Sequence, residues 1–212
     1  MKFFYYRFKN LNNKYMKYDI DNSGFGNEVL YRMCAEKPLH NDVDIIIGKL
    51  WLIGRSYSAA IERRAGDNFK ISDAAQNLYD SDIDELIKSI TEIDRTTEKN
   101  VGEVLRLHKY LTGRIKEVTG VQKRSLASKY LHFHAPKSVF IFDSIVNKNL
   151  RQILRSTKQK FKLSDEYRDK YDVTYADFCC RSIYYRDNIL EKKLGKNVTP
   201  RRLDMELYNG YY

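Results

Sequence analysis

The chain has 212 residues, of which 42% are hydrophobic, enough for one sizeable globular domain. No apolar run approaches the roughly 20 residues that a membrane span needs. The N-terminus also lacks the apolar stretch of a signal peptide, so we expect a cytoplasmic protein. Three cysteines, two of them adjacent at Cys179 and Cys180, fit neither a disulfide framework nor the usual spacing of a zinc site.

The positive charge of the chain is concentrated in its C-terminal part. Lysine and arginine number 38 against 28 acidic residues, a net charge of +10. Residues 1–119 contain 19 basic and 18 acidic side chains, whereas residues 120–212 contain 19 basic and 10 acidic ones. A one-sided basic excess indicates a polyanionic partner, and the 17 tyrosines and 10 phenylalanines supply rings that can stack on bases. We therefore expect a nucleic-acid-binding protein.

In the first half of the chain, apolar residues recur at intervals of three and four, the period of an amphipathic helix. The first 40 residues lack this pattern and are expected to be irregular, with one or two short strands as the alternative. Trp51 follows the apolar side of its helix, so we predict that it lies in the core. Ser72 or Asp73 is expected to cap a short helix, and Asp82 the next one. The predicted helices of this half are 41–64, a short one ending at 78, 83–93 and 101–118, the last closed by Gly120.

The second half continues as helices joined by short connections. Pro136 is expected to follow the end of one helix, and Asp143 or Ser144 to cap the next. Thr199 and Pro200 have the pattern of an N-cap followed by proline at the first helical position. The predicted elements are helices 124–132, one after 143, 175–194 ended by Gly195, and 201–207, with a basic loop over 156–170. Because no repeat or linker interrupts the chain, we predict a single all-α domain over 1–212 around a cleft, with a bilobal arrangement as the alternative.

The most distinctive stretch is 118–150, with the order helix, glycine-containing hairpin, helix, short extended link, aspartate, helix. VTGVQ at 118–122 corresponds to a hairpin of the form L-P-G-V-G, and FDSIV at 142–146 to an aspartate motif of the form V-D-T-H-V. This arrangement resembles the core of the helix-hairpin-helix DNA glycosylase superfamily, in a divergent branch near the 8-oxoguanine-glycosylase fold. Thr119 and Gln122 depart from the family's hairpin, and Ser144 departs from its aspartate motif.

The resemblance implies an enzyme that rotates a damaged or modified base of double-stranded DNA out of the helix and cuts its N-glycosidic bond. The hairpin would hold a phosphate through backbone N–H groups, and Asp143 would stabilise the positive charge that develops on the sugar. Members that also cut the strand carry a lysine near the start of the helix after the hairpin. Ser125 stands at the comparable position, so we favour base excision without a lysine, with Lys123 and Lys129 kept as alternative nucleophiles.

The remaining candidate residues form two groups. His132 and His134 lie two positions apart on a predicted helix and therefore point in different directions, so we expect no metal site, and we expect no cofactor. We expect one of these histidines in the core and the other near the pocket. Candidates for binding the substrate base are Arg55, Tyr57, Ser58, Ser125, His132 and His134. Candidates for binding DNA are Gly120, Val121, Lys123, Arg124, Ser144, Asn147, Lys148, Arg151 and Arg201.

The sequence thus predicts a monomeric DNA glycosylase acting in DNA repair or in defence against phage DNA with modified bases. The alternatives are a non-catalytic nucleic-acid-binding protein on the same scaffold and a helical module whose basic half binds an acidic protein. Asp143 distinguishes them, because it would line a pocket in the enzyme and merely cap its helix otherwise.

Overall fold

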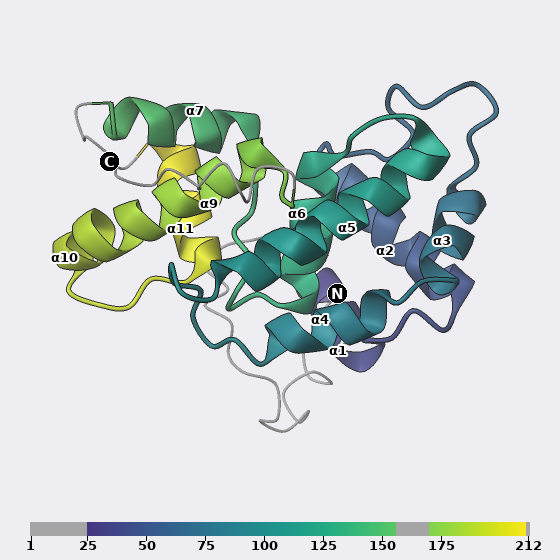
Figure 1. The fold of residues 1–212 in the computed structure, drawn as a ribbon, viewed down its shortest axis with the longest axis horizontal. Helices are drawn as coiled ribbons and strands as arrows, with labels where there is room; N and C mark the ends of the chain where they lie inside the picture. The colour runs from purple at the N-terminus through teal and green to yellow at the C-terminus, as the bar shows by residue number, and fades with distance from the viewer. Residues whose placement is uncertain (1–24, 156–169, 211–212) are drawn as a thin grey trace, which may run out of the picture.

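The computed structural model describes residues 25–155 and 170–210, which form helices and connecting loops without a strand (Figure 1). The predicted all-α class is confirmed at this level. Within the described ranges, no helix is both long enough and apolar enough to cross a membrane. The elements are α1 (Phe25–Glu36), α2 (Val43–Ser56), α3 (Ile71–Tyr79), α4 (Ile83–Thr91), α5 (Val101–Thr119), α6 (Arg124–His134), α7 (Ser144–Ile153), α9 (Val173–Tyr185), the π-helix η1 (Arg186–Leu190), α10 (Glu191–Leu194) and α11 (Pro200–Asn209).

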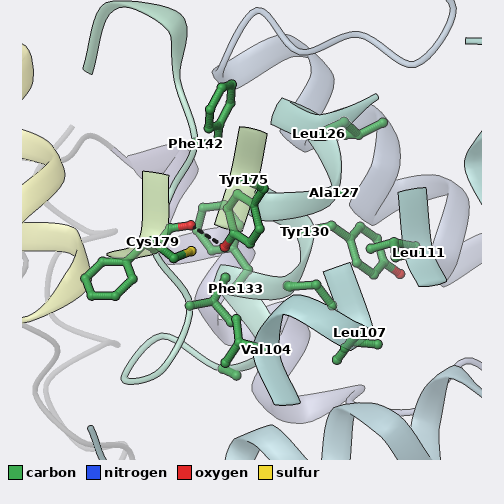
Figure 2. Close-up of a cluster of buried hydrophobic side chains, with 14 of the residues drawn as sticks. Val104, Leu107, Leu111, Leu126, Ala127, Tyr130, Phe133, Phe142, Tyr175 and Cys179 are labelled. Atoms are coloured by element: carbon green, nitrogen blue, oxygen red, sulfur yellow. Dashed lines mark hydrogen bonds between the residues drawn. The ribbon is translucent and has the colours of Figure 1, made fainter. Parts of the chain in front are cut away.

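Helices α5 and α6 occupy the centre of the molecule. In Figure 1, α1 to α4 lie on one side of them, and α7 and α9 to α11 lie on the other. Buried side chains from both sides join in one continuous apolar cluster. Figure 2 shows the part of it where Leu107 and Leu111 of α5, Tyr130 of α6 and Tyr175 of α9 meet. The hydroxyl of Tyr175 donates a hydrogen bond of 2.8 Å to the carbonyl of Phe140, which ties α9 to the link after α6.

The N-terminal region differs from the prediction. Residues 25–36 form helix α1 instead of an irregular or extended segment, and residues 1–24 lie outside the described residues. Leu30, Tyr31 and Cys34 of α1 are buried against α2 and α6. Seven of the twelve residues of α1 are hydrophobic, but they are distributed around the helix, so it depends on tertiary packing more than on a strong periodic pattern.

The first long helix is shorter than predicted. Helix α2 ends at Ser56, and the chain then turns back on it rather than continuing to residue 64. Gly54 allows this reversal, because a Cβ atom at this position would lie 3.1 Å from the Cα of Ala60. Ser58 and Arg64 have φ angles of 51° and 63°, in the left-handed region that a continuing α-helix excludes. The turn brings Ile61 into the core, where it is 1% exposed.

The prediction for Trp51 is wrong. Its side of α2 faces solvent, and the residue is 52% exposed. The core side of the helix is occupied instead by Ile46, Leu50 and Ile53, which are fully buried. The periodic pattern of α2 was wide enough to include Trp51, and only packing against α3 and α6 decided which apolar residues became the inner ones.

Most predicted helix ends agree with the structure. Gly120 closes α5 in the left-handed conformation with φ 68°, and Gly195 closes α10 with φ 63°. Thr199 caps α11, its hydroxyl accepting a 3.2 Å bond from the Arg202 N–H, with Pro200 at the first position. The predicted caps Ser72 and Asp73 are wrong, because α3 begins at Ile71 after Lys70. The predicted basic loop over 156–170 lies almost wholly outside the described residues.

Candidate functional site

A buried lysine and an aspartate form the centre of the candidate site. The Nζ atom of Lys129, on α6, lies 3.6 Å from Oδ2 of Asp143, which directly precedes α7. The lysine side chain is 3% exposed and that of the aspartate 28% exposed. The pair therefore joins a group inside the protein to one that opens to solvent.

Lys129 is held at this place by two further hydrogen bonds. Its amine donates to the Ser125 hydroxyl at 2.7 Å and to the Phe142 carbonyl at 3.3 Å. Ser125 lies one turn earlier on α6, so the two side chains share a face of the helix. Burial lowers the pKa of Lys129, while the negative charge of Asp143 opposes this shift. A lysine that loses its proton more easily than usual is a better nucleophile near neutral pH.

Asp143 serves its helix and the lysine at the same time. Its Oδ1 accepts a 2.8 Å bond from the N–H of Ile145, so the residue is the N-cap of α7, as predicted. Its other oxygen faces Lys129. The cap fixes the orientation of the carboxylate, because one oxygen is already committed to the helix.

Tyr57, the residue after α2, covers the lysine from another side. The Nζ of Lys129 lies 5.8 Å from the centre of the Tyr57 ring, and the guanidinium carbon of Arg201 lies 5.9 Å from it. The Tyr57 hydroxyl donates a hydrogen bond to Oδ1 of Asn27 on α1. Burial raises the pKa of Tyr57 to about 12, so the hydroxyl stays protonated. The face of the Tyr57 ring therefore attracts both cations, Lys129 and Arg201.

Helix α11 adds a second ion pair next to the first. Arg201 Nη1 lies 2.8 Å from Oδ2 of Asp204. Asp204 is 8% exposed, and burial raises the pKa of its carboxyl to about 6, against the opposing charges of Arg201 and Lys129. Sequence reasoning proposed Arg201 as a DNA contact but missed Asp204. The sequence shows that Asp204 lies one helical turn after Arg201, but it does not show that Asp204 is buried.

A groove of about 500 Å³ runs beside Asp143 along α7. Lys148 is exposed, and Arg151 lies 3.3 Å from Asp177 of α9. Its lining includes three basic side chains and no acidic one, and it contains four of the residues predicted to bind DNA. Its lining residues are Phe142, Ser144, Asn147, Lys148, Arg151, Gln152 and Arg155.

The hairpin after α5 lies against the loop that follows α2. The amine of Lys123 donates to the carbonyl of Arg63, and partial burial lowers its pKa. Gly120 and Val121 form the turn, in which the N–H of Val121 bonds to the Thr119 hydroxyl at 3.2 Å and is therefore occupied. The Nε of Arg124 lies 2.8 Å from Oδ1 of Asp172, so the arginine already has an ion-pair partner within the protein.

Four predicted substrate residues have their described contacts with groups other than Lys129 and Asp143. His132 is buried and hydrogen-bonded to the Tyr31 hydroxyl and the Val139 carbonyl. His134 stacks on the rings of His40 and Tyr130, with ring centroids 5.2 Å apart in both cases. Arg55 lies over Trp51, and Ser58 is an exposed turn residue.

The comparisons give this chain no relatives. No family model, no curated protein and no solved structure matches it.

Proposed function

We propose that this protein is a DNA glycosylase that excises a damaged or modified base, with Lys129 and Asp143 as its reacting groups. The observation that carries the proposal is the 3.6 Å contact between the buried amine of Lys129 and the partly exposed carboxylate of Asp143, next to a basic groove. Lysine amines of lowered pKa attack electrophilic carbon, and fixed carboxylates stabilise developing cations. Duplex DNA with a flipped nucleotide is the partner that suits the basic groove and the lysine together.

The position of Lys129 changes the mechanism that we favour. The sequence favoured attack by water, because Ser125 stands where a lysine is usual. Ser125 instead accepts a hydrogen bond from Lys129, whose amine reaches the same place from one turn further along α6. In the proposed step, the neutral amine forms a bond to C1′ of the sugar while the C1′–N bond breaks. The base leaves with that electron pair and takes up the proton that the amine nitrogen loses after it bonds to C1′, and Asp143 stabilises the positive charge on the sugar in between.

Borohydride trapping on DNA with a preformed abasic site tests this proposal without knowledge of the base. An amine that attacks C1′ forms an imine, which borohydride reduces to a stable protein–DNA adduct. We expect an adduct with the wild-type protein and none with Lys129→Met, while Lys88→Met, at an exposed lysine of α4, serves as the matched control and retains it. Thermal unfolding of each variant shows whether it is folded.

A panel of duplexes with modified bases then identifies the substrate through abasic-site formation. Abasic product without a trapped adduct would mean attack by water, as the sequence first suggested. Salt-dependent binding without product or adduct would contradict the enzyme and leave the non-catalytic DNA-binding protein. Absence of DNA binding would contradict both.

A further inference from the structure

The sequence contains one tryptophan, and the structure places it on the surface. Trp51 is 52% exposed in the middle of α2, on the side away from the core. A side chain of this size is usually buried over most of its surface, so an exposed one indicates a contact surface. The core of this helix is complete without it, because Ile46, Leu50 and Ile53 already fill the inner side.

An arginine lies against this indole. Arg55 follows Trp51 by one helical turn, and its guanidinium carbon lies 5.8 Å from the centre of the ring. The arginine side chain is itself 65% exposed and lies 3.9 Å from Glu62, a weak surface pair. Indole and guanidinium together present flat groups of the kind on which unpaired bases stack.

The surface next to Arg55 is basic. Glu62 connects Arg55 to the loop after α2, where Arg63 and Arg64 are exposed. The same loop receives the amine of Lys123 from the hairpin, through the Arg63 carbonyl. Three cations therefore lie near Glu62, the ion-pair partner of Arg55. The acidic residues of this loop are Glu62 and Asp67.

We propose that Trp51 and Arg55 form a stacking platform for an unpaired nucleotide of single-stranded DNA, with Arg63, Arg64 and Lys123 holding the adjoining phosphates. A nucleic acid supplies both flat bases for the indole and negative charges for the cations near it, whereas an apolar protein surface would leave these cations without a partner. The platform needs no chemistry at Lys129, so it does not rest on the proposed glycosylase activity.

The single tryptophan makes the contact directly measurable, because all indole fluorescence of the chain comes from Trp51. A short oligodeoxythymidylate should quench this fluorescence, and added salt should reverse the effect. A blunt duplex of the same length, which offers few unpaired bases, should quench it much less. Anisotropy of a labelled strand gives the affinity independently of the indole.

Substitutions separate stacking from charge. Trp51→Leu should weaken single-strand binding about tenfold, and Trp51→Phe should retain most of it, because stacking contributes roughly 1–3 kcal/mol per base. Arg64→Gln should lower the salt dependence, whereas Arg106→Gln, an exposed arginine of α5 paired with Glu103, should leave binding unchanged. Tyr79→Leu is the control for an exposed aromatic residue elsewhere, on α3.

Two results would overturn the platform. One is single-strand binding by anisotropy with no change in Trp51 fluorescence, and the other is equal affinity of Trp51→Leu and the wild type. Either result leaves borohydride trapping at Lys129 unaffected, so the platform and the proposed function can fail separately.

Discussion

Asp143 and Lys129 meet although each is already committed to its own helix. One carboxylate oxygen of Asp143 caps α7, and the other lies 3.6 Å from the amine of Lys129, which also bonds to Ser125 of α6. The contact therefore fixes the start of α7 against the middle of α6. Capping and a chemical role are compatible in this arrangement, because the two oxygens have separate partners.

The two roles of Asp143 can be separated by substitution. Asp143→Asn keeps an oxygen for the cap, so it should retain about 1 kcal/mol of stability that Asp143→Ala loses, although both variants lose the charge beside Lys129. Asp143→Ala should cost about 1 kcal/mol through the lost cap. Chemical denaturation measures the stability, and borohydride trapping measures the reaction, which both variants should impair. A stable Asp143→Asn variant with full trapping would show that the carboxylate only caps the helix.

Asp204 should make the protein less stable as the pH rises through the weakly acidic range. Its carboxyl has a pKa of about 6 in the folded protein, against 3.8 without burial, so the folded state holds a proton that the unfolded state has lost. The unfolding free energy should fall by at most about 3 kcal/mol between pH 4 and 6, because each unit of pKa difference corresponds to about 1.4 kcal/mol. Asp204→Asn removes this titrating group and with it the pH dependence that it causes. The stability of the variant relative to the wild type should therefore increase from pH 4 to 6, and a constant difference would contradict the shift.

The buried histidines should make the protein less stable as the pH falls. Burial lowers the pKa of His132 to about 3 and that of His108 to about 4, from 6.5, so both remain neutral in the folded protein while the unfolded chain takes up protons. Their contribution to stability is complete above pH 6.5 and is lost as the pH falls below it. His132→Gln should reduce the loss between pH 7 and 5 by about 2 kcal/mol. Urea unfolding at several pH values measures this, and an unchanged pH dependence would argue against a neutral buried His132.

Two glycines of the α5 region give a matched test of the hairpin. Gly120 has φ 68°, so Gly120→Ala should destabilise the protein by about 1 kcal/mol through backbone strain alone, since no atom lies within 4 Å of the added Cβ. Gly113, in the middle of α5, has equally open surroundings and a helical backbone. Gly113→Ala should therefore stabilise the protein by about 0.5–1 kcal/mol. Opposite signs in thermal unfolding are expected, and equal signs would contradict the assigned hairpin geometry.

Local signals in the sequence determined most of the helices and several of their ends. Gly120, Asp143, Gly195 and the Thr199–Pro200 pair act through their own backbone or the next turn, so their effect is visible without the rest of the chain. The sequence alone also identified Asp143 and Lys129 as candidate catalytic residues. It could not state their separation, because that distance depends on how the link between α6 and α7 folds.

Only the tertiary structure decided what is buried. Trp51 and Ile53 are both apolar residues of α2, yet one is half exposed and the other fully buried, because neighbouring helices cover one side of α2 and leave the other open. Asp204 lies on a helix with an ordinary polar pattern, and its burial beside Lys129 and Arg201 follows from the docking of α11. Periodicity describes one helix at a time, whereas burial, and with it the pKa of Lys129, is set by the helices that surround it.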